Sequence, residues 1–131
     1  MRVLLDTQVW LWMQASPERF NDHARSLVED PASTLMLSAA SSWEIAIKHG
    51  LGKLELPEPP EVYVPGRMRS GGVTPLPVEH SHALRVSRLE PHHRDAFDRL
   101  LVAQALVEHV PILSADPVFA RYGVEHVEAG Q

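Results

Sequence analysis

The chain has 131 residues, of which 44% are hydrophobic and 22% charged, and its formal net charge at pH 7 is −5. This size suits one domain with its own hydrophobic core, so we expect residues 1–131 to form a single domain. The absence of cysteine excludes disulfides, zinc sites built from thiolates and cysteine nucleophiles. The acidic balance argues against a nucleic-acid partner, unless several carboxylates gather around cations.

The N-terminal run "MRVLLDTQVWLWM" does not have the pattern of a targeting segment. Asp6 and Gln8 interrupt its apolar stretch, whereas a signal peptide needs an uninterrupted one. No apolar run in the chain approaches the roughly 20 residues that cross a bilayer. We therefore expect a soluble, cytoplasmic protein with no membrane partner.

The first half of the chain alternates between strand and helix patterns. Apolar runs at 2–7 and 33–38 predict buried strands. Helical patterns follow at 9–15, at 22–30 behind the N-cap residue Asn21, and from 39 until Gly50 and Gly52 end that helix. The segment 55–72 is rich in proline and glycine, and Pro65 predicts that any helix there is short or bent.

The second half continues this alternation, with strands expected at 73–78, 110–116 and 124–127. Helices are expected at 79–89, across 92–105, and at 117–123 with Pro117 at the first position. The connections are too long for hairpins, which favours parallel strands with helices on both faces. The sequence therefore predicts an α/β fold, a three-layer α/β/α sandwich around a central, mostly parallel sheet.

Acidic residues recur where ligands bind in such sheets, beyond the carboxyl ends of the strands. Asp6 ends the first strand, and Asp116 ends the strand "PILS". Asp95 and Asp98 open one helix, and Glu44 lies near the start of another. Because helices that follow parallel strands begin at the same edge, five acids from four segments are expected to converge on one cleft.

Most of these acids also have a purely structural interpretation. Glu44 fits a capping box with Ser41 as the N-cap residue, and taken alone that interpretation is the better one. Asp95 stands at a helix start, where the helix dipole favours an acid. Asp98 fits an ion pair with Arg94 on the helix surface. Asp116 precedes a proline and fits an N-cap.

Asp6 and Asp98 are harder to explain structurally. Asp6 follows three apolar residues in a strand, where aspartate is disfavoured and costly to bury without a partner or a cation. Asp98 lies on a helical stripe that continues to Val102 and Ala105, so it is expected to point inward. Hard divalent cations relieve the repulsion within such a cluster, which favours Mg²⁺, or Mn²⁺, with oxygen ligands.

Without the four acids Asp6, Glu44, Asp98 and Asp116, 13 acidic residues remain against 12 basic ones, so RNA is not excluded as a partner.

Four segments, in this order and spacing, resemble the PIN domain and more narrowly the VapC-type toxins of bacterial type II toxin–antitoxin modules. They are "LLDTQVWLW", "SSWEIAIKHGLGKL", "HHRDAFDRLLVAQA" and "ILSADPVFARYGV", and the resemblance spans Leu4 to Val124. It implies a Mg²⁺-dependent endoribonuclease that hydrolyses RNA phosphodiester bonds. It also implies a homodimer and a cognate antitoxin whose C-terminal segment occupies the active-site groove.

The resemblance carries the metal-binding acids of the family onto Asp6, Glu44, Asp98 and Asp116. Asp95 matches an extra acid of one subgroup, as a metal ligand or as a residue behind the ligands. Two small polar residues, Thr7 and Ser114, match residues that line the pocket, and Ala96 stands where the subgroup often has proline. In the implied mechanism Asp6, Asp98 and Asp116 hold Mg²⁺, which activates a water for in-line attack, and Glu44 completes the site or orients that water.

Three basic residues are candidates for steering phosphates, or alternatively ordinary surface charges; they are Arg94, Arg99 and Lys48. His80 and His82 are expected on an exposed helix surface. Two other functions are considered: a non-catalytic RNA- or protein-binding module, and a phosphotransfer protein. The intact set of acids opposes the first, and "LLDTQ" offers neither the paired acids nor the strand-end lysine that the second expects.

Overall fold

The computed structural model describes residues 1–92 and 95–130. Its centre is a five-stranded sheet in the order β3-β2-β1-β4-β5, in which every pairing between neighbouring strands is parallel. The strands are β1 (Arg2–Leu5), β2 (Thr34–Ser38), β3 (Thr74–Leu76), β4 (Ile112–Ser114) and β5 (His126–Glu128). All five predicted strands are therefore present, and the sheet is parallel throughout.

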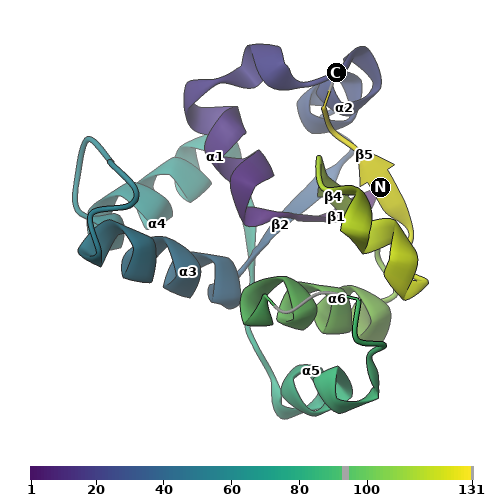
Figure 1. The fold of residues 1–131 in the computed structure, drawn as a ribbon. Helices are drawn as coiled ribbons and strands as arrows, with labels where there is room; N and C mark the ends of the chain where they lie inside the picture. Colours follow the sequence, from purple (N-terminus) through teal and green to yellow (C-terminus); the bar gives the residue numbers. More distant parts are fainter. Residues whose placement is uncertain (93–94, 131) are drawn as a thin grey trace.

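Helices cover both faces of this sheet, as Figure 1 shows. They are α1 (Thr7–Ala15), α2 (Asp22–Glu29), α3 (Ala39–Gly50), α4 (Pro60–Gly71), α5 (His80–Arg85) and α6 (Ala96–Glu108), with short 3₁₀ helices at Pro17–Arg19, Val86–Arg88 and Pro117–Tyr122. The three-layer α/β/α sandwich is thus confirmed.

Alternation along the strands builds two separate cores. On β2, Leu35 and Leu37 point to one face and pack with α1, α2 and α4, whereas Met36 points to the other face and packs with α6. Helix α3 follows β2 and contributes to both cores, with Ile45 on one side and Ala40 on the other. The carboxyl end of the sheet is therefore framed by α3 and α6.

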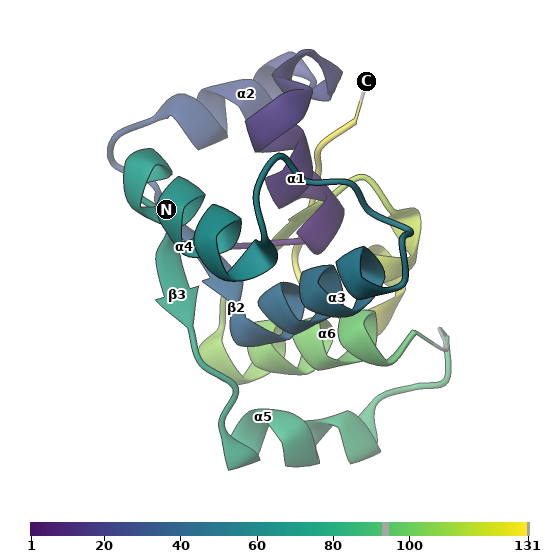
Figure 2. The same ribbon diagram turned by 90° about the vertical axis from the view of Figure 1, so that its left-hand side faces the viewer.

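Helix α5 packs on the outer side of α6, away from the sheet (Figure 2). His82 lies in this contact and is 1% exposed, so the prediction of an exposed His82 is wrong, while His80 is exposed. The His82 ring accepts the backbone N–H of Glu79 at Nδ1 (3.0 Å), and its Nε2 lies 2.8 Å from the Glu108 carboxylate. The buried ring is tolerated because both nitrogens have partners.

Helix α4 is longer than predicted. It has 12 residues and continues past Pro65. A proline at this position removes the hydrogen bond to the carbonyl of Glu61. Both Pro65 and Glu61 are exposed, so the carbonyl that loses its donor is not buried in an apolar core. The helix therefore lies in the predicted segment, but it is not short.

Candidate active site in an acidic pocket at the carboxyl end of the sheet

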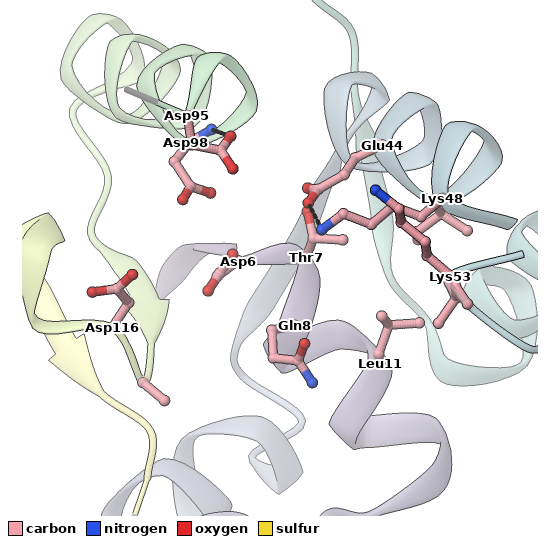
Figure 3. Close-up of a pocket in the computed structure, with 13 residues that line it drawn as sticks. Asp6, Thr7, Gln8, Leu11, Glu44, Lys48, Lys53, Asp95, Asp98 and Asp116 are labelled. Carbon is pink, nitrogen blue, oxygen red and sulfur yellow. Dashed lines mark hydrogen bonds and ion pairs between the residues drawn. The ribbon is translucent and has the colours of Figure 1, made fainter. Parts of the chain in front are cut away.

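A pocket of about 480 Å³ opens at the carboxyl end of the sheet, between α1, α3 and α6 (Figure 3). All five predicted acids line it: Asp6, Glu44, Asp95, Asp98 and Asp116. They come from the ends of β1 and β4 and from α3 and α6, as expected for a parallel sheet. The convergence of these five residues is therefore a property of the fold.

Asp6 lies centrally in the pocket, at the junction of β1 and α1 (Figure 3). It is 8% exposed, and its backbone N–H donates to the carbonyl of Leu113 on β4 (3.0 Å). Burial raises the pKa of its carboxyl to about 6, helped by the nearby charges of Glu44 and Asp116 and opposed by the hydroxyl of Ser114. The position is therefore costly for a lone anion and favourable for one that faces a cation.

Ser114 connects two of the acids, although it is fully buried and does not itself line the pocket. Its hydroxyl donates to Asp6 Oδ2 (2.8 Å), and its oxygen accepts the backbone N–H of Asp116 (3.0 Å). Asp116 is exposed, and its own side chain accepts the N–H of Val118 as the N-cap residue of the following 3₁₀ helix. One serine thus orients the Asp6 carboxylate and the backbone at Asp116.

Glu44 is a buried carboxylate with only one partnered oxygen. Its Oε2 accepts from Lys48 Nζ at 2.5 Å, while its Oε1 is buried and has no hydrogen-bond partner among residues 1–92 and 95–130. The hydrogen bond from Lys48 to Glu44 is also the main reason why the pKa of Lys48 is raised, against an opposing effect of burial. An unpartnered buried carboxylate oxygen on a pocket wall suits an additional positive ligand.

The capping-box interpretation of Glu44 is wrong in the structure. Helix α3 begins at Ala39, and its N-cap residue is Ser38, whose hydroxyl accepts the N–H of Ala40 (3.0 Å). Ser41 is instead buried and accepts a hydrogen bond from the hydroxyl of Thr7 (2.8 Å). Thr7 therefore lines the pocket with its hydroxyl directed to α3, and Glu44 serves no helix cap.

Asp95 and Asp98 form the wall opposite Glu44 (Figure 3). Asp95 is the N-cap residue of α6, and its Oδ1 accepts the backbone N–H of Asp98 (3.0 Å). The structure therefore confirms Asp95 as a helix cap and places it on the pocket wall, while its role at a metal stays a prediction. In the described part of the chain, no three acidic or histidine side chains are placed so that together they could hold a metal ion.

A family model described as PIN domain matches residues 3–125 of this chain. The chain belongs to the PIN domain family. This match covers all four segments that carry the resemblance seen in the sequence, and it includes each of the five acids.

The narrower similarity to VapC proteins is visible in one curated relative. Ribonuclease VapC16 of Mycobacterium tuberculosis (strain ATCC 25618 / H37Rv) is 52% identical over 61 residues, which are 47% of this chain and 43% of that protein. The match thus spans less than half of the relative's length. It supports the sequence-based assignment to VapC-like PIN domains.

Solved structures share the fold of this PIN domain over nearly its whole length. A complex of VapBC2 from Rickettsia felis with a DNA fragment from its promoter has a TM-score of 0.74, with 13% identity over 98% of this chain and 99% of that chain. DNA-bound VapBC from Salmonella typhimurium has a TM-score of 0.68, with 14% identity over 98% of both chains. At this level of identity the comparison establishes the fold.

The basic residues that were predicted to steer phosphates do not all lie at the pocket. Lys48 lines the pocket, but Arg99 does not, because its guanidinium donates to the backbone carbonyls of Glu90 (3.0 Å) and Val86 (3.4 Å). Arg94 lies outside the described residues. Lys53 also lines the pocket and was not singled out from the sequence, although "GLGKL" places it one residue after the glycine that ends the α3 turn. None of the described helices is long and apolar enough to cross a membrane.

Proposed function

We propose that this PIN domain is a Mg²⁺-dependent endoribonuclease toxin of the VapC kind, which hydrolyses RNA phosphodiester bonds and is inhibited by a cognate antitoxin. The single observation that carries this proposal is the buried Asp6 carboxylate among four further acids in one open pocket. The names of the relatives, a ribonuclease and two VapBC complexes, support it. We further propose a homodimer and a cytoplasmic location for the toxin.

The donor set of the pocket fits a hard divalent cation. All five acids offer oxygen ligands, the buried Oε1 of Glu44 lacks a partner among the described residues, and the pKa of Asp6 is raised by burial and like charge. Asp6, Asp98 and Asp116 would hold Mg²⁺, with Glu44 completing the site and Asp95 either joining it or fixing the start of α6. Mn²⁺ satisfies the same donors.

The residues of the chain have distinct roles in this proposal. When bound, Mg²⁺ supplies charge neutralisation at the phosphate and lowers the pKa of a water molecule. Ser114 holds one oxygen of the Asp6 carboxylate in place, and Lys48 holds Oε2 of Glu44, which leaves Oε1 for the cation. The Thr7–Ser41 hydrogen bond fixes α1 against α3, which sets the distance between Asp6 and Glu44.

The test compares purified wild type with Asp6→Asn and Asp98→Asn in cleavage of total RNA with Mg²⁺ and with EDTA. We expect wild-type cleavage only with Mg²⁺, loss of cleavage in both variants, and unchanged circular dichroism. Asp22→Asn, an exposed acid of α2 away from the pocket, is the matched control and should cleave normally. Full Mg²⁺-dependent activity in both pocket variants would overturn the mechanism. RNA binding without cleavage by wild type would favour the binding-module alternative.

A further inference from the structure

The lysines of this chain are concentrated in the pocket. The sequence contains two lysines, Lys48 and Lys53, against ten arginines. Both lysines line the pocket, and none of the arginines that the structure describes does. The pocket thus combines five carboxylates with two ammonium groups, although a purely cation-binding site needs no lysine.

Lys53 owes its position to the way in which α3 ends. Gly52 adopts a left-handed conformation (φ 72°), its N–H donates to the carbonyl of His49 (3.0 Å), and the N–H of Lys53 donates to the carbonyl of Lys48 (2.9 Å). This pair of hydrogen bonds is the Schellman motif, in which a glycine reverses the chain at the helix end. The reversal brings Lys53 back alongside Lys48, onto the same wall of the pocket.

The two lysines differ in what they contact. Lys48 is bound to Glu44, with its Nζ 2.5 Å from Oε2. Lys53 is exposed, and no carboxylate in the described part of the chain lies within ion-pair distance of it. Figure 3 shows the Lys53 side chain reaching along the Glu44 side of the pocket, across from Asp98 and Asp116. The ammonium group of Lys53 is therefore available to an anion that enters the pocket.

We propose that Lys53 is a substrate-binding residue that contacts a backbone phosphate flanking the one that is cleaved. This inference rests on the proposed function and adds to it how an acidic pocket tolerates a polyanion. A lysine acts on a phosphate as a compact point charge, which positions a strand without reading its sequence. Lys48 neutralises Glu44, and Lys53 offsets the repulsion between the substrate and the remaining acids.

The test measures cleavage of a defined single-stranded RNA with Mg²⁺ over a series of KCl concentrations. We expect Lys53→Gln to raise KM about tenfold at low salt, with kcat nearly unchanged, because one charge-assisted contact is lost. The slope of log(kcat/KM) against log[KCl] should flatten by about 0.7, the value for one phosphate contact of a single strand. Lys53→Arg should restore both quantities. Arg69→Gln, an exposed charge of α4 that does not line the pocket, is the control for loss of one positive charge.

A second measurement observes the lysines directly. Reductive methylation with ¹³C-formaldehyde keeps the positive charge and gives separate NMR signals for the two lysines and the N-terminal amine. The Lys53 signal is assigned as the one that is missing from the spectrum of Lys53→Arg. In EDTA, adding the same RNA should shift this signal. The inference fails if Lys53→Gln keeps the wild-type KM and salt slope, or if Arg69→Gln changes them equally. Wild type that neither cleaves nor binds RNA would overturn the proposed function as well.

Discussion

The hydroxyl of Ser114 donates to the carboxylate of Asp6 at 2.8 Å, joining two residues that are 108 positions apart in the sequence. The bond connects the end of β4 to the residue that directly follows β1 and lines the acidic pocket. It favours the ionised form of Asp6 and so lowers the pKa of a carboxyl that burial raises.

Ser114→Ala should move the acidic limb of the pH–activity profile to higher pH, by up to about one unit, because the ionised Asp6 loses its hydrogen bond. Activity near neutral pH should fall, while activity at high pH recovers. Cleavage rates measured from pH 5 to 9 test this expectation. Ser42→Ala on α3 is the control, because Ser42 lies outside this pocket and its profile should match wild type. An unshifted profile in Ser114→Ala would show that the bond does not govern Asp6.

Asp6→Asn should stabilise the metal-free protein near pH 7. The pKa of Asp6 is about 6 in the folded chain and 3.8 in the reference state, so the folded state binds more protons between these values. The stability that Asp6 contributes is therefore lost as pH rises from about 4 to 6. The variant should gain up to about 3 kcal/mol at pH 7 and much less at pH 4. Urea denaturation in EDTA at both pH values measures this difference. Equal stability differences at the two pH values would contradict it.

Added Mg²⁺ should reverse this order of stability. A divalent cation favours ionised Asp6, so wild type should gain stability with Mg²⁺ at pH 7 and gain little at pH 4. Thermal denaturation with and without Mg²⁺ is the measurement. Asp6→Asn, which lacks the anionic oxygen, should respond less at either pH, and an equal response would exclude Asp6 as a ligand.

Ser38→Ala should destabilise the protein by about 1 kcal/mol, because Ser38 is the N-cap residue of α3. Glu44→Gln should leave stability nearly unchanged and abolish RNA cleavage, because Glu44 lines the pocket and caps nothing. Chemical denaturation and cleavage assays on the two variants separate these effects. RNA cleavage retained at the wild-type rate in Glu44→Gln would show that Glu44 does not act in the reaction.

His82→Ala should cost about 2–4 kcal/mol of unfolding free energy, because it leaves a cavity and strands the hydrogen-bonding partners at Glu79 and Glu108. His80→Ala, two residues earlier and exposed, should change stability by less than about 0.5 kcal/mol. Urea denaturation of both variants tests the pair. Similar values for the two histidines would mean that α5 does not depend on this contact.

The sequence predicts the fold and the acidic pocket for one physical reason. Apolar runs alternating with helical patterns require a parallel sheet, and a parallel sheet brings the ends of its strands to one edge. Asp6 and Asp116 follow from that rule alone. The roles of the five acids remain proposals, since position does not establish chemistry.

The features that sequence analysis missed depend on tertiary packing. His82 lies on a short polar helix, and nothing local reveals that α6 covers it. Ser38 and Ser41 are both good caps, and only the observed start of α3 distinguishes them. Lys53 was overlooked because a lysine after a glycine is ordinary until the Schellman turn brings it beside Lys48.

The parallel pairing of β1 with β4 joins Leu4 to Ile112, so the central strand of the sheet gains its second neighbour only after most of the chain exists. Such long-range pairing gives a high contact order and slow folding. It also means that a nascent chain holds Asp6 long before it holds Asp116, and that an N-terminal fragment shorter than 116 residues lacks at least one of the five acids. Under the proposed function, a nascent chain that ends before Asp116 lacks one of the proposed metal ligands and should not cleave RNA.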